Sequence, residues 1–253
     1  MAIVYEKSKG LTDTPLSYCP GCTHGIIHKL VADALVNLDV LHRTVGVAPV
    51  GCSVLTYNFF NCDMVQAPHG RAPAVATGLK RVMPDNLVFT YQGDGDLAAI
   101  GMAETVHSAM RGENITLIFV NNATYGMTGG QMAPTTLPGQ VTQTSPYGRD
   151  VSGSGSGAGY PVRVCEMLSG LDGVAYAERV SVHDVPHIRK AGKAIQKAFQ
   201  TQIEKKGFSI VEILSTCPTN WGLDPVESLT WLKENLSPYY PLGVTKDATG
   251  GAR

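Results

Sequence analysis

The hydrophobic pattern of this chain alternates between short aliphatic runs and segments with helical spacing. Aliphatic runs of strand length lead to residue 50 and cover residues 87–91, 115–120 and 210–214. Continuous runs of this length are typical of strands buried on both faces. Helices are expected over residues 26–38, 68–80, 97–110 and 186–205, and a further short strand over 174–177. The alternation predicts an α/β fold, a doubly wound parallel sheet with helices on both faces.

Polar or sulfur-bearing residues follow four of the predicted strands. The segments that contain them are Val50-Gly51-Cys52-Ser53, Gly93-Asp94-Gly95-Asp96, Asn121-Asn122 and Cys217-Pro218. Residues 87–120 form a strand, a helix and a strand, which makes the sheet parallel at least there. Ligands of open parallel sheets lie outside the carboxyl ends of the strands, so we expect these four segments to line one site.

Two parts of the chain lack a periodic pattern. Residues 134–161 contain the Gly- and Ser-rich segment 152–159, which is flexible by composition. A long irregular loop in a compact domain is usually functional, so we interpret it as a cover or a partner-facing loop. The tail after Leu223 is expected to be an extended arm on a surface. The whole chain, residues 1–253, is interpreted as a single domain with an N-terminal CxxC segment.

Composition narrows the class of protein. The chain has 43% hydrophobic and 16% charged residues and a net charge of -1. It has no basic or acidic block, so neither nucleic acid nor an anionic membrane surface is expected as a partner. No apolar stretch reaches the ~20 residues of a spanning helix, and we expect a soluble, cytoplasmic protein. Six cysteines without a secretion signal favour metal ligands or buried small residues over disulfides.

The segments around Asp94 and Asn122 have the spacing of a magnesium site. The two residues are 28 positions apart, with one helix and one strand between them. Magnesium usually takes one or two carboxylates together with substrate phosphates, and Gly93 and Gly95 let the backbone approach such an anion. The simpler alternative is that the two segments are unrelated turns.

Four of the cysteines are suitably placed to bind a metal group. Cys19 and Cys22 form a CxxC pair, and Cys52 and Cys217 follow predicted strands. Four convergent thiolates can hold a 4Fe-4S cluster. A structural zinc ion, a thioredoxin-like redox pair and unreactive thiols are the alternatives that the residues leave open.

Together these motifs resemble the thiamine-diphosphate-dependent enzymes, whose cofactor motif runs from Gly-Asp-Gly to Asn-Asn. The continuation from Asn122 to Gln131, NATYGMTGGQ, is similar to the beta subunit of the 2-oxoacid:ferredoxin oxidoreductases. The resemblance implies a thiamine-diphosphate-binding fold. It implies magnesium ligation by Asp94, Asn122 and the main-chain carbonyl of Thr124. It also implies cofactor contacts, which would be Val50, Gly51, Cys52, Ser53, His69, Gly95, Asp96, Gly126 and Met127.

The resemblance also implies roles for the cysteines and histidines. Beta subunits carry a 4Fe-4S cluster on the cysteine pattern that Cys19, Cys22, Cys52 and Cys217 match, whereas Cys62 and Cys165 are assigned to packing. His24 is a further candidate for the cofactor site. The other histidines are expected to be structural: His28, His42, His107, His183 and His187.

The implied activity is oxidative decarboxylation of a 2-oxoacid to acyl-coenzyme A and carbon dioxide, with reduction of ferredoxin. The substrate expected is a branched-chain 2-oxoacid such as 2-oxoisovalerate, with 2-oxoglutarate as the alternative. Partners implied are an alpha subunit with the pyrimidine-binding domain and its activating glutamate, gamma and ferredoxin-like subunits, ferredoxin and coenzyme A. The competing functions are a non-redox thiamine-diphosphate enzyme and a non-catalytic iron-sulfur or zinc protein for electron transfer.

Overall fold

The computed structural model describes residues 6–153 and 157–250 and contains one seven-stranded sheet. Its strands, in the order β2-β1-β3-β4-β6-β5-β7, are β2 (Asp63–Gln66), β1 (Thr44–Ala48), β3 (Leu87–Gly93), β4 (Thr116–Asn121), β6 (Phe208–Leu214), β5 (Val174–Ser181) and β7 (Gly243–Asp247). The first six are mutually parallel, and β7 pairs antiparallel with β5. The predicted doubly wound parallel sheet is therefore confirmed, with an antiparallel edge strand added.

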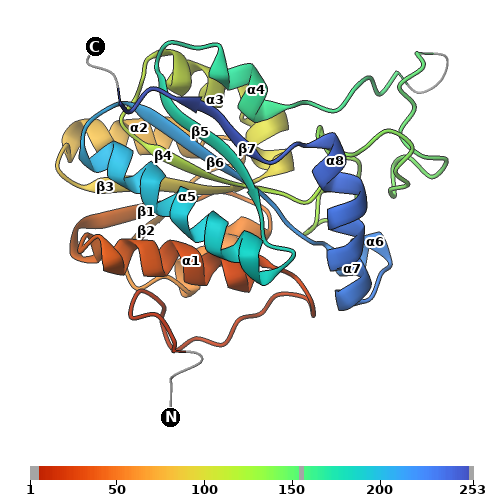
Figure 1. Cartoon of the computed structure of the whole chain (residues 1–253), viewed down its shortest axis with the longest axis horizontal. Helices are drawn as coiled ribbons and strands as arrows, with labels where there is room; N and C mark the ends of the chain where they lie inside the picture. Colours follow the sequence, from red (N-terminus) through yellow and green to blue (C-terminus); the bar gives the residue numbers. More distant parts are fainter. Residues whose placement is uncertain (1–5, 154–156, 251–253) are drawn as a thin grey trace.

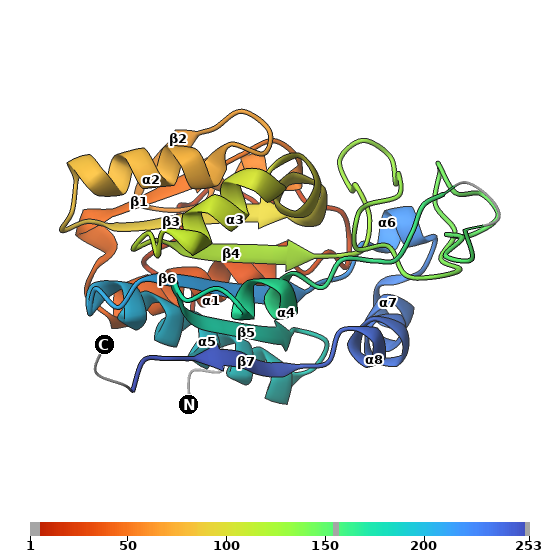
Figure 2. The same cartoon turned by 90° about the horizontal axis from the view of Figure 1, so that it is seen from above.

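Helices cover both faces of the sheet (Figure 1 and Figure 2). Helices α1 (His24–Asn37) and α5 (Val185–Ile203) pack on one face. Helices α2 (Ala72–Val82), α3 (Met102–Met110) and α4 (Val164–Ser169) pack on the other. In the described part of the chain, no helix is long and apolar enough to cross a membrane.

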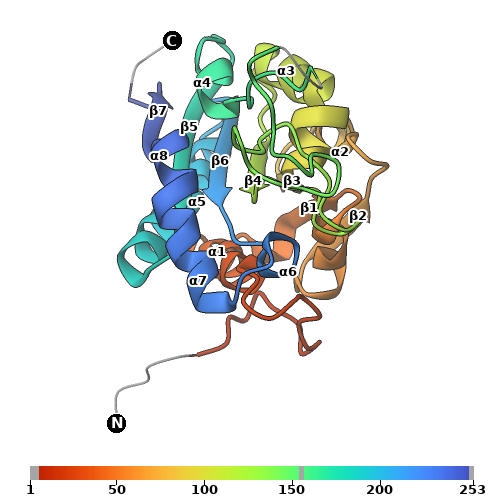
Figure 3. The ribbon, with the colours of Figure 1, turned by 90° about the vertical axis from the view of Figure 1, so that its right-hand side faces the viewer.

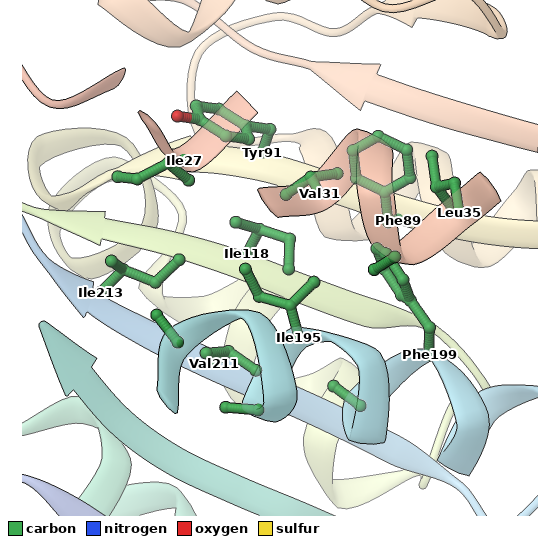
Figure 4. Packing of buried hydrophobic residues seen from close by; sticks show 14 of the residues in the cluster. Ile27, Val31, Leu35, Phe89, Tyr91, Ile118, Ile195, Phe199, Val211 and Ile213 are labelled. Carbon is green, nitrogen blue, oxygen red and sulfur yellow. The ribbon is translucent and has the colours of Figure 1, made fainter. Parts of the chain in front are cut away.

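The strands supply both cores because successive side chains point to opposite faces. On β4, Ile118 and Val120 join the cluster with α1 and α5, whereas Leu117 and Phe119 join the cluster on the other face. Figure 4 shows Ile118 lying between Ile27 of α1 and Ile195 of α5. The central strands are fully buried on both faces, which explains why their sequences read as continuous apolar runs.

The carboxyl ends of β1, β3, β4 and β6 meet at one edge of the sheet, as the sequence predicts. Gly93 at the end of β3 pairs in register with Val120, and Asn121 at the end of β4 pairs with Leu214. Figure 3, which faces this edge, shows the C-terminal helical segments beside the strand ends. They are α6 (Pro218–Trp221), α7 (Pro225–Trp231) and α8 (Ser237–Tyr239).

The expectation of an extended arm after Leu223 was wrong. Helix α7 continues through a π-helical segment, η4 (Leu232–Leu236), into α8, and β7 follows. Asp224 and Glu227 form a capping box at the start of α7, with Pro225 at the first helical position. These are sequence signals for a helix start. Leu232 and Leu236 are fully buried, so the segment packs as an amphipathic helix rather than lying on a surface.

Other boundaries also differ from the expectations. The helix predicted over 97–110 is divided into a π-helical turn, η3 (Asp96–Ile100), and α3. The loop that carries Gly70 packs against the backbone at this point, because a Cβ atom on Gly101 would lie 2.6 Å from the carbonyl oxygen of Gly70. A residue larger than glycine would clash at position 101, and the regular helix is interrupted there. Strand β2 and helix α4 were not expected.

The described residues of the loop 134–161 contain no helix or regular strand, but the loop is well anchored. The guanidinium of Arg149 donates hydrogen bonds to backbone carbonyls on both sides of the loop, at Ala133, Pro134, Thr136, Ala158, Gly159 and Tyr160. Residues 154–156 of the Gly- and Ser-rich segment lie outside the described residues.

Candidate functional site

A pocket of about 590 Å³, measured to its open mouth, lies at the carboxyl edge of the sheet. All of the residues predicted as cofactor or magnesium contacts line it: Val50, Gly51, Cys52, Ser53, His69, Asp94, Gly95, Asp96, Asn122, Thr124, Gly126 and Met127. His24, the further candidate from the sequence, also lines it, and the structure adds Gly93, Val120, Tyr125 and Thr128. The segments that follow β1, β3 and β4 therefore share one cavity with the loop before α2. Cys217 and Pro218, which follow β6 and were expected in the same site, are not among the lining residues.

The Asp94 carboxyl is buried and is held by three hydrogen-bond donors. Its Oδ1 accepts from the backbone N–H of Gly95 (2.8 Å). Its Oδ2 accepts from the backbone N–H of Thr124 (3.1 Å) and the hydroxyl of Thr135 (2.6 Å). Burial nevertheless raises the pKa of Asp94 to about 6, because the donors only partly offset the desolvation of the carboxylate. A carboxylate has about four acceptor positions, so one remains for a cation.

Asp96 fixes the loop that carries His69. Its Oδ1 accepts hydrogen bonds from the backbone N–H of Gly70 (2.6 Å) and faces Nδ1 of His69 at 2.5 Å, while Oδ2 accepts from the side-chain amide of Gln92 (2.6 Å). With Nδ1 occupied by Asp96, the other ring nitrogen of His69 is left for the pocket. Asp96 thus lines the pocket and orients a histidine in it.

The turn after β4 depends on a buried polar chain that crosses three strands. The side-chain amide of Asn121 donates to Glu212 on β6 (2.8 Å), and Glu212 forms an ion pair with Arg179 on β5 (2.9 Å). The Asn121 side-chain oxygen accepts from the backbone N–H of Ala123 (3.2 Å), which has a left-handed φ of 57°. Asn121 therefore shapes the turn, and Asn122 is the residue presented to the pocket.

The four predicted cluster cysteines come together beside this pocket. A Cβ atom on Gly126 would lie 3.4 Å from Sγ of Cys52 and 3.6 Å from Sγ of Cys217. Burial, together with the nearby Cys217, Cys52 and Cys19, raises the pKa of Cys22 to about 12. Burial also raises the pKa of Cys52, to about 11. Such thiols need a cationic group among them to ionise at neutral pH.

Asn220 connects the cysteine group to the pocket. Its side-chain amide donates to the backbone carbonyl of Gly126 (2.8 Å) and to Sγ of Cys217 (3.1 Å). Sequence reasoning missed Asn220, Thr135 and Gln92. Asn220 lies three residues after Cys217, within the short helix α6. This spacing could have indicated a contact between its side chain and the cysteine sulfur. Thr135 and Gln92 carry no local signal, because their partners are set by the tertiary fold.

Comparison with known proteins assigns the family. A model of "Thiamine pyrophosphate enzyme, C-terminal TPP binding domain" matches residues 49–213. Ketoisovalerate oxidoreductase subunit VorA of Methanothermobacter thermautotrophicus is 48% identical over 244 residues, covering 96% of this chain and 50% of that protein. The 2-oxoglutarate synthase subunit KorB of Methanocaldococcus jannaschii is 34% identical over 227 residues, covering 87% of this chain and 78% of that protein. The chain belongs to the beta subunits of the 2-oxoacid:ferredoxin oxidoreductases.

A solved structure supports this assignment of the beta subunit. The chain from "2-oxoglutarate:ferredoxin oxidoreductase from Magnetococcus marinus with 2-oxoglutarate, coenzyme A and succinyl-CoA bound" superposes with a TM-score of 0.74 at 25% identity. The match covers 96% of the beta subunit described here and 84% of that chain. The beta subunit spans about half the length of the curated VorA relatives it matches.

The pocket of the beta subunit fits thiamine diphosphate, which is thiamine pyrophosphate under its other name. Gly95 and Gly51 bring backbone close to the cavity without side chains, and Gly51 has a φ of 107° that favours glycine. The Tyr125 ring lies directly over Gly95, and its hydroxyl donates to the Gly95 carbonyl (3.2 Å). This close packing sets the shape of the wall near Asp94.

We predict that Gly95→Ala disrupts this wall. The backbone of Gly95 is helical, with φ -65° and ψ -31°, so alanine is compatible with it. However, the added Cβ would lie 2.0 Å from Cε1 of Tyr125, so the ring must move. We expect a loss of about 1–3 kcal/mol in the free energy of unfolding and weaker thiamine diphosphate binding, measured by chemical denaturation and calorimetry.

Gly78→Ala is the matched control. Gly78 lies in α2, and an added Cβ there meets no atom within 4 Å. This substitution should stabilise the chain by about 0.5–1 kcal/mol and leave cofactor binding unchanged. If Gly95→Ala bound the cofactor as tightly as Gly78→Ala does, the close contact with Tyr125 would have no role in the site.

The raised pKa of Asp94 predicts a pH dependence for the ligand-free chain. The folded-state pKa of about 6 exceeds the ordinary value of 3.8, so between these pH values the folded chain holds a proton that the unfolded chain has lost. The stability gained from this proton is lost as the pH rises through 6. When the pH is lowered from 7 to 5, the free energy of unfolding of the parent should increase by about 1 kcal/mol relative to that of Asp94→Ala, as measured by urea unfolding. Asp63→Ala, at an exposed site, should follow the parent.

Proposed function

We propose that the chain carries the cofactor site of an oxidoreductase that converts a 2-oxoacid and coenzyme A to acyl-coenzyme A and carbon dioxide, and passes electrons to ferredoxin. The observation that carries this proposal is the position of Cys52. It lines the pocket that holds Asp94 and Asn122, and it also belongs to the four-cysteine group. A decarboxylation site and an electron acceptor would then share a wall.

Magnesium binding is proposed for Asp94, Asn122 and the main-chain carbonyl of Thr124. Asp94 retains one acceptor position after its three hydrogen bonds, and the side-chain oxygen of Asn122 accepts one bond from Thr124 N–H (3.2 Å). Oxygen donors of this kind, completed by the two phosphates of the cofactor, fit the near-octahedral preference of magnesium. The ion would keep Asp94 ionised despite its burial.

A 4Fe-4S cluster is proposed for Cys19, Cys22, Cys52 and Cys217. A single zinc ion, with bonds of about 2.3 Å, would hold its sulfurs about 3.8 Å apart. Within the described residues, no three of these sulfurs lie within 4.8 Å of one another. The spacing favours a larger group over one ion, and four thiolates are the usual ligands of such a cluster.

The residues around the cofactor position it and connect it to the cluster. Thiamine diphosphate, when bound, supplies the electron sink for decarboxylation. Asp96 holds His69 toward the pocket, and Asn220 links Cys217 to the Gly126 backbone of the cofactor loop. The hydrogen bond from Asn220 to the sulfur is of the type that tunes cluster potentials. Electron transfer from cofactor to cluster would therefore cross a short, rigid contact.

A branched-chain 2-oxoacid, 2-oxoisovalerate, is the substrate we propose. The lining residues of the pocket include no lysine or arginine, and the half-exposed apolar side chains of Val50 and Met127 lie at it. A second carboxylate, as in 2-oxoglutarate, would find no permanent cation among them. The 48% identity to a ketoisovalerate oxidoreductase subunit agrees with this choice, while the KorB relatives keep 2-oxoglutarate as the alternative.

We propose that the activity requires a second domain besides the one sheet of the described residues. We propose that a pyrimidine-binding domain with the activating glutamate comes from an alpha subunit or from further sequence of the same polypeptide. Gamma and ferredoxin-like subunits would complete the complex. The loop 134–161 is the proposed contact, since the apolar parts of Val141, Tyr147 and Tyr160 are exposed on it. Residues 1–253 would form one domain of this assembly, and its cytoplasmic location remains a prediction.

The cluster assignment is tested by replacing Cys217 with alanine. We expect this variant to lose iron, visible absorption and ferredoxin reduction, because removing one thiolate opens the cluster. Cys165→Ala is the control, since Cys165 is fully buried on α4 beside Glu212 and Arg179, and α4 contributes no residue to the pocket lining. Equal iron content in Cys217→Ala and the parent would rule out Cys217 as a ligand.

The activity is tested by turnover with two substrates. The chain should be expressed with its neighbouring genes, purified without oxygen, and assayed for coenzyme A-dependent dye reduction. We expect the catalytic efficiency with 2-oxoisovalerate to exceed that with 2-oxoglutarate by about tenfold or more, since an unpaired carboxylate in an apolar pocket costs at least 1–2 kcal/mol. Preference for 2-oxoglutarate would reverse the substrate assignment. Full turnover by purified residues 1–253 alone would disprove the need for a second domain.

A further inference from the structure

The turn between β5 and α5 gathers two imidazoles and a carboxylate. One ligand atom from each of His183, Asp184 and His187 lies within 4.8 Å of the others. Among the described residues, no other three His, Cys, Asp or Glu side chains have this spacing. The turn is separate from the cofactor pocket and from the four cysteines. The sequence suggested only structural roles for both histidines, whereas the structure places them together with a carboxylate as metal ligands are placed.

The distances within the group leave room for an ion. Nε2 of His183 lies 3.3 Å from Oδ2 of Asp184, and the two histidine rings are 4.1 Å apart between centroids. Nitrogen and oxygen ligands about 2.0–2.1 Å from a tetrahedral ion are about 3.3 Å from each other. The separation of Nε2 and Oδ2 thus matches that of two ligands on one ion, and is long for a direct hydrogen bond.

His183 is held in the orientation of a metal ligand. Its Nδ1 lies 2.8 Å from the hydroxyl of Ser181, a fully buried residue at the end of β5. Metal-binding histidines usually fix their second ring nitrogen in this way. The side chain of His183 is only 6% exposed.

The two oxygens of Asp184 have different surroundings. Oδ1 accepts the backbone N–H of His187 (2.9 Å) as the N-cap of α5, and it also lies 2.6 Å from Nδ1 of His187. Oδ2 is the oxygen that faces His183. The carboxylate can therefore cap the helix with one oxygen while the other binds a cation.

We propose that His183, Asp184 and His187 bind a divalent first-row transition ion of the zinc class. Two imidazoles and one carboxylate are the donors that suit such an ion, whereas they are a poor set for magnesium or calcium. Three protein ligands leave a coordination position for water or for a side chain of another subunit. The ion would join the end of β5 to the start of α5.

The test uses Co²⁺ as a spectroscopic probe on the full chain and on Asp184→Asn. Asparagine caps helices as well as aspartate does, so the start of α5 is kept while the charged ligand is lost. We expect Co²⁺ bands from nitrogen and oxygen ligands in the parent, and affinity lower by about tenfold or more in Asp184→Asn. Thiolate ligation by the cysteines has its own charge-transfer absorption, which separates the two sites.

Asp224→Asn is the matched control, because Asp224 caps α7 in the same manner as Asp184 caps α5. It should bind Co²⁺ like the parent. A second variant, His187→Gln, should also bind Co²⁺ about tenfold or more weakly, and the rise in melting temperature that Zn²⁺ gives the parent should be smaller in both site variants. Co²⁺ spectra and affinity that are the same in the parent, Asp184→Asn and His187→Gln would overturn the proposal, as would bands due only to thiolate ligation.

Discussion

The parallel pairing of β1, β3, β4 and β6 is the constraint on which the rest of the molecule depends. Hydrogen bonding in register brings the ends of these strands to one edge, and the residues that follow them have to turn away from the sheet there. Several polar side chains at these turns, among them Ser53, Asp94, Asp96 and Thr124, are buried from water. Their polar groups are then satisfied by one another, which creates a cavity with fixed donors and acceptors.

The site is held by buried polar contacts that are costly to break. Asp94 is held by Gly95, Thr124 and Thr135, and Asp96 by Gln92 and by the adjacent residues His69 and Gly70. Behind them, Arg179 is fully buried and paired with Glu212, which in turn holds Asn121. Removing one partner of a buried ion pair leaves an uncompensated charge, at a cost of about 3–5 kcal/mol. The same contacts that position the cofactor residues therefore tie the stability of the sheet to the geometry of the site.

Much of the site could be predicted from the sequence because its residues lie in short motifs at strand ends. Asp94, Asn122 and Cys52 are placed by local turns and by a strand order that aliphatic runs reveal. Thr135 and Gln92 could not be predicted, since their contacts with Asp94 and Asp96 arise only when distant segments pack together.

The errors in the predicted fold have two different physical origins. The capping box at Asp224 was present in the sequence, but Pro and Tyr residues further along suggested an extended arm. The break before α3, in contrast, comes from the close approach of Gly101 to Gly70, and Gly70 belongs to a loop 31 residues earlier in the chain. Local signals can correct the first kind of error, whereas the second requires the tertiary structure.

The antiparallel direction of β7 has a practical consequence. The strand starts opposite Arg179, near the carboxyl edge, and finishes opposite Tyr176, so the chain leaves it toward the other end of the sheet (Figure 2). A fluorophore, an affinity resin or an electrode linker attached after β7 would therefore be oriented away from the cavity. Immobilised in this way, the molecule would present its reactive edge to the solution, which suits it to surface-based measurements of subunit docking and electron flow.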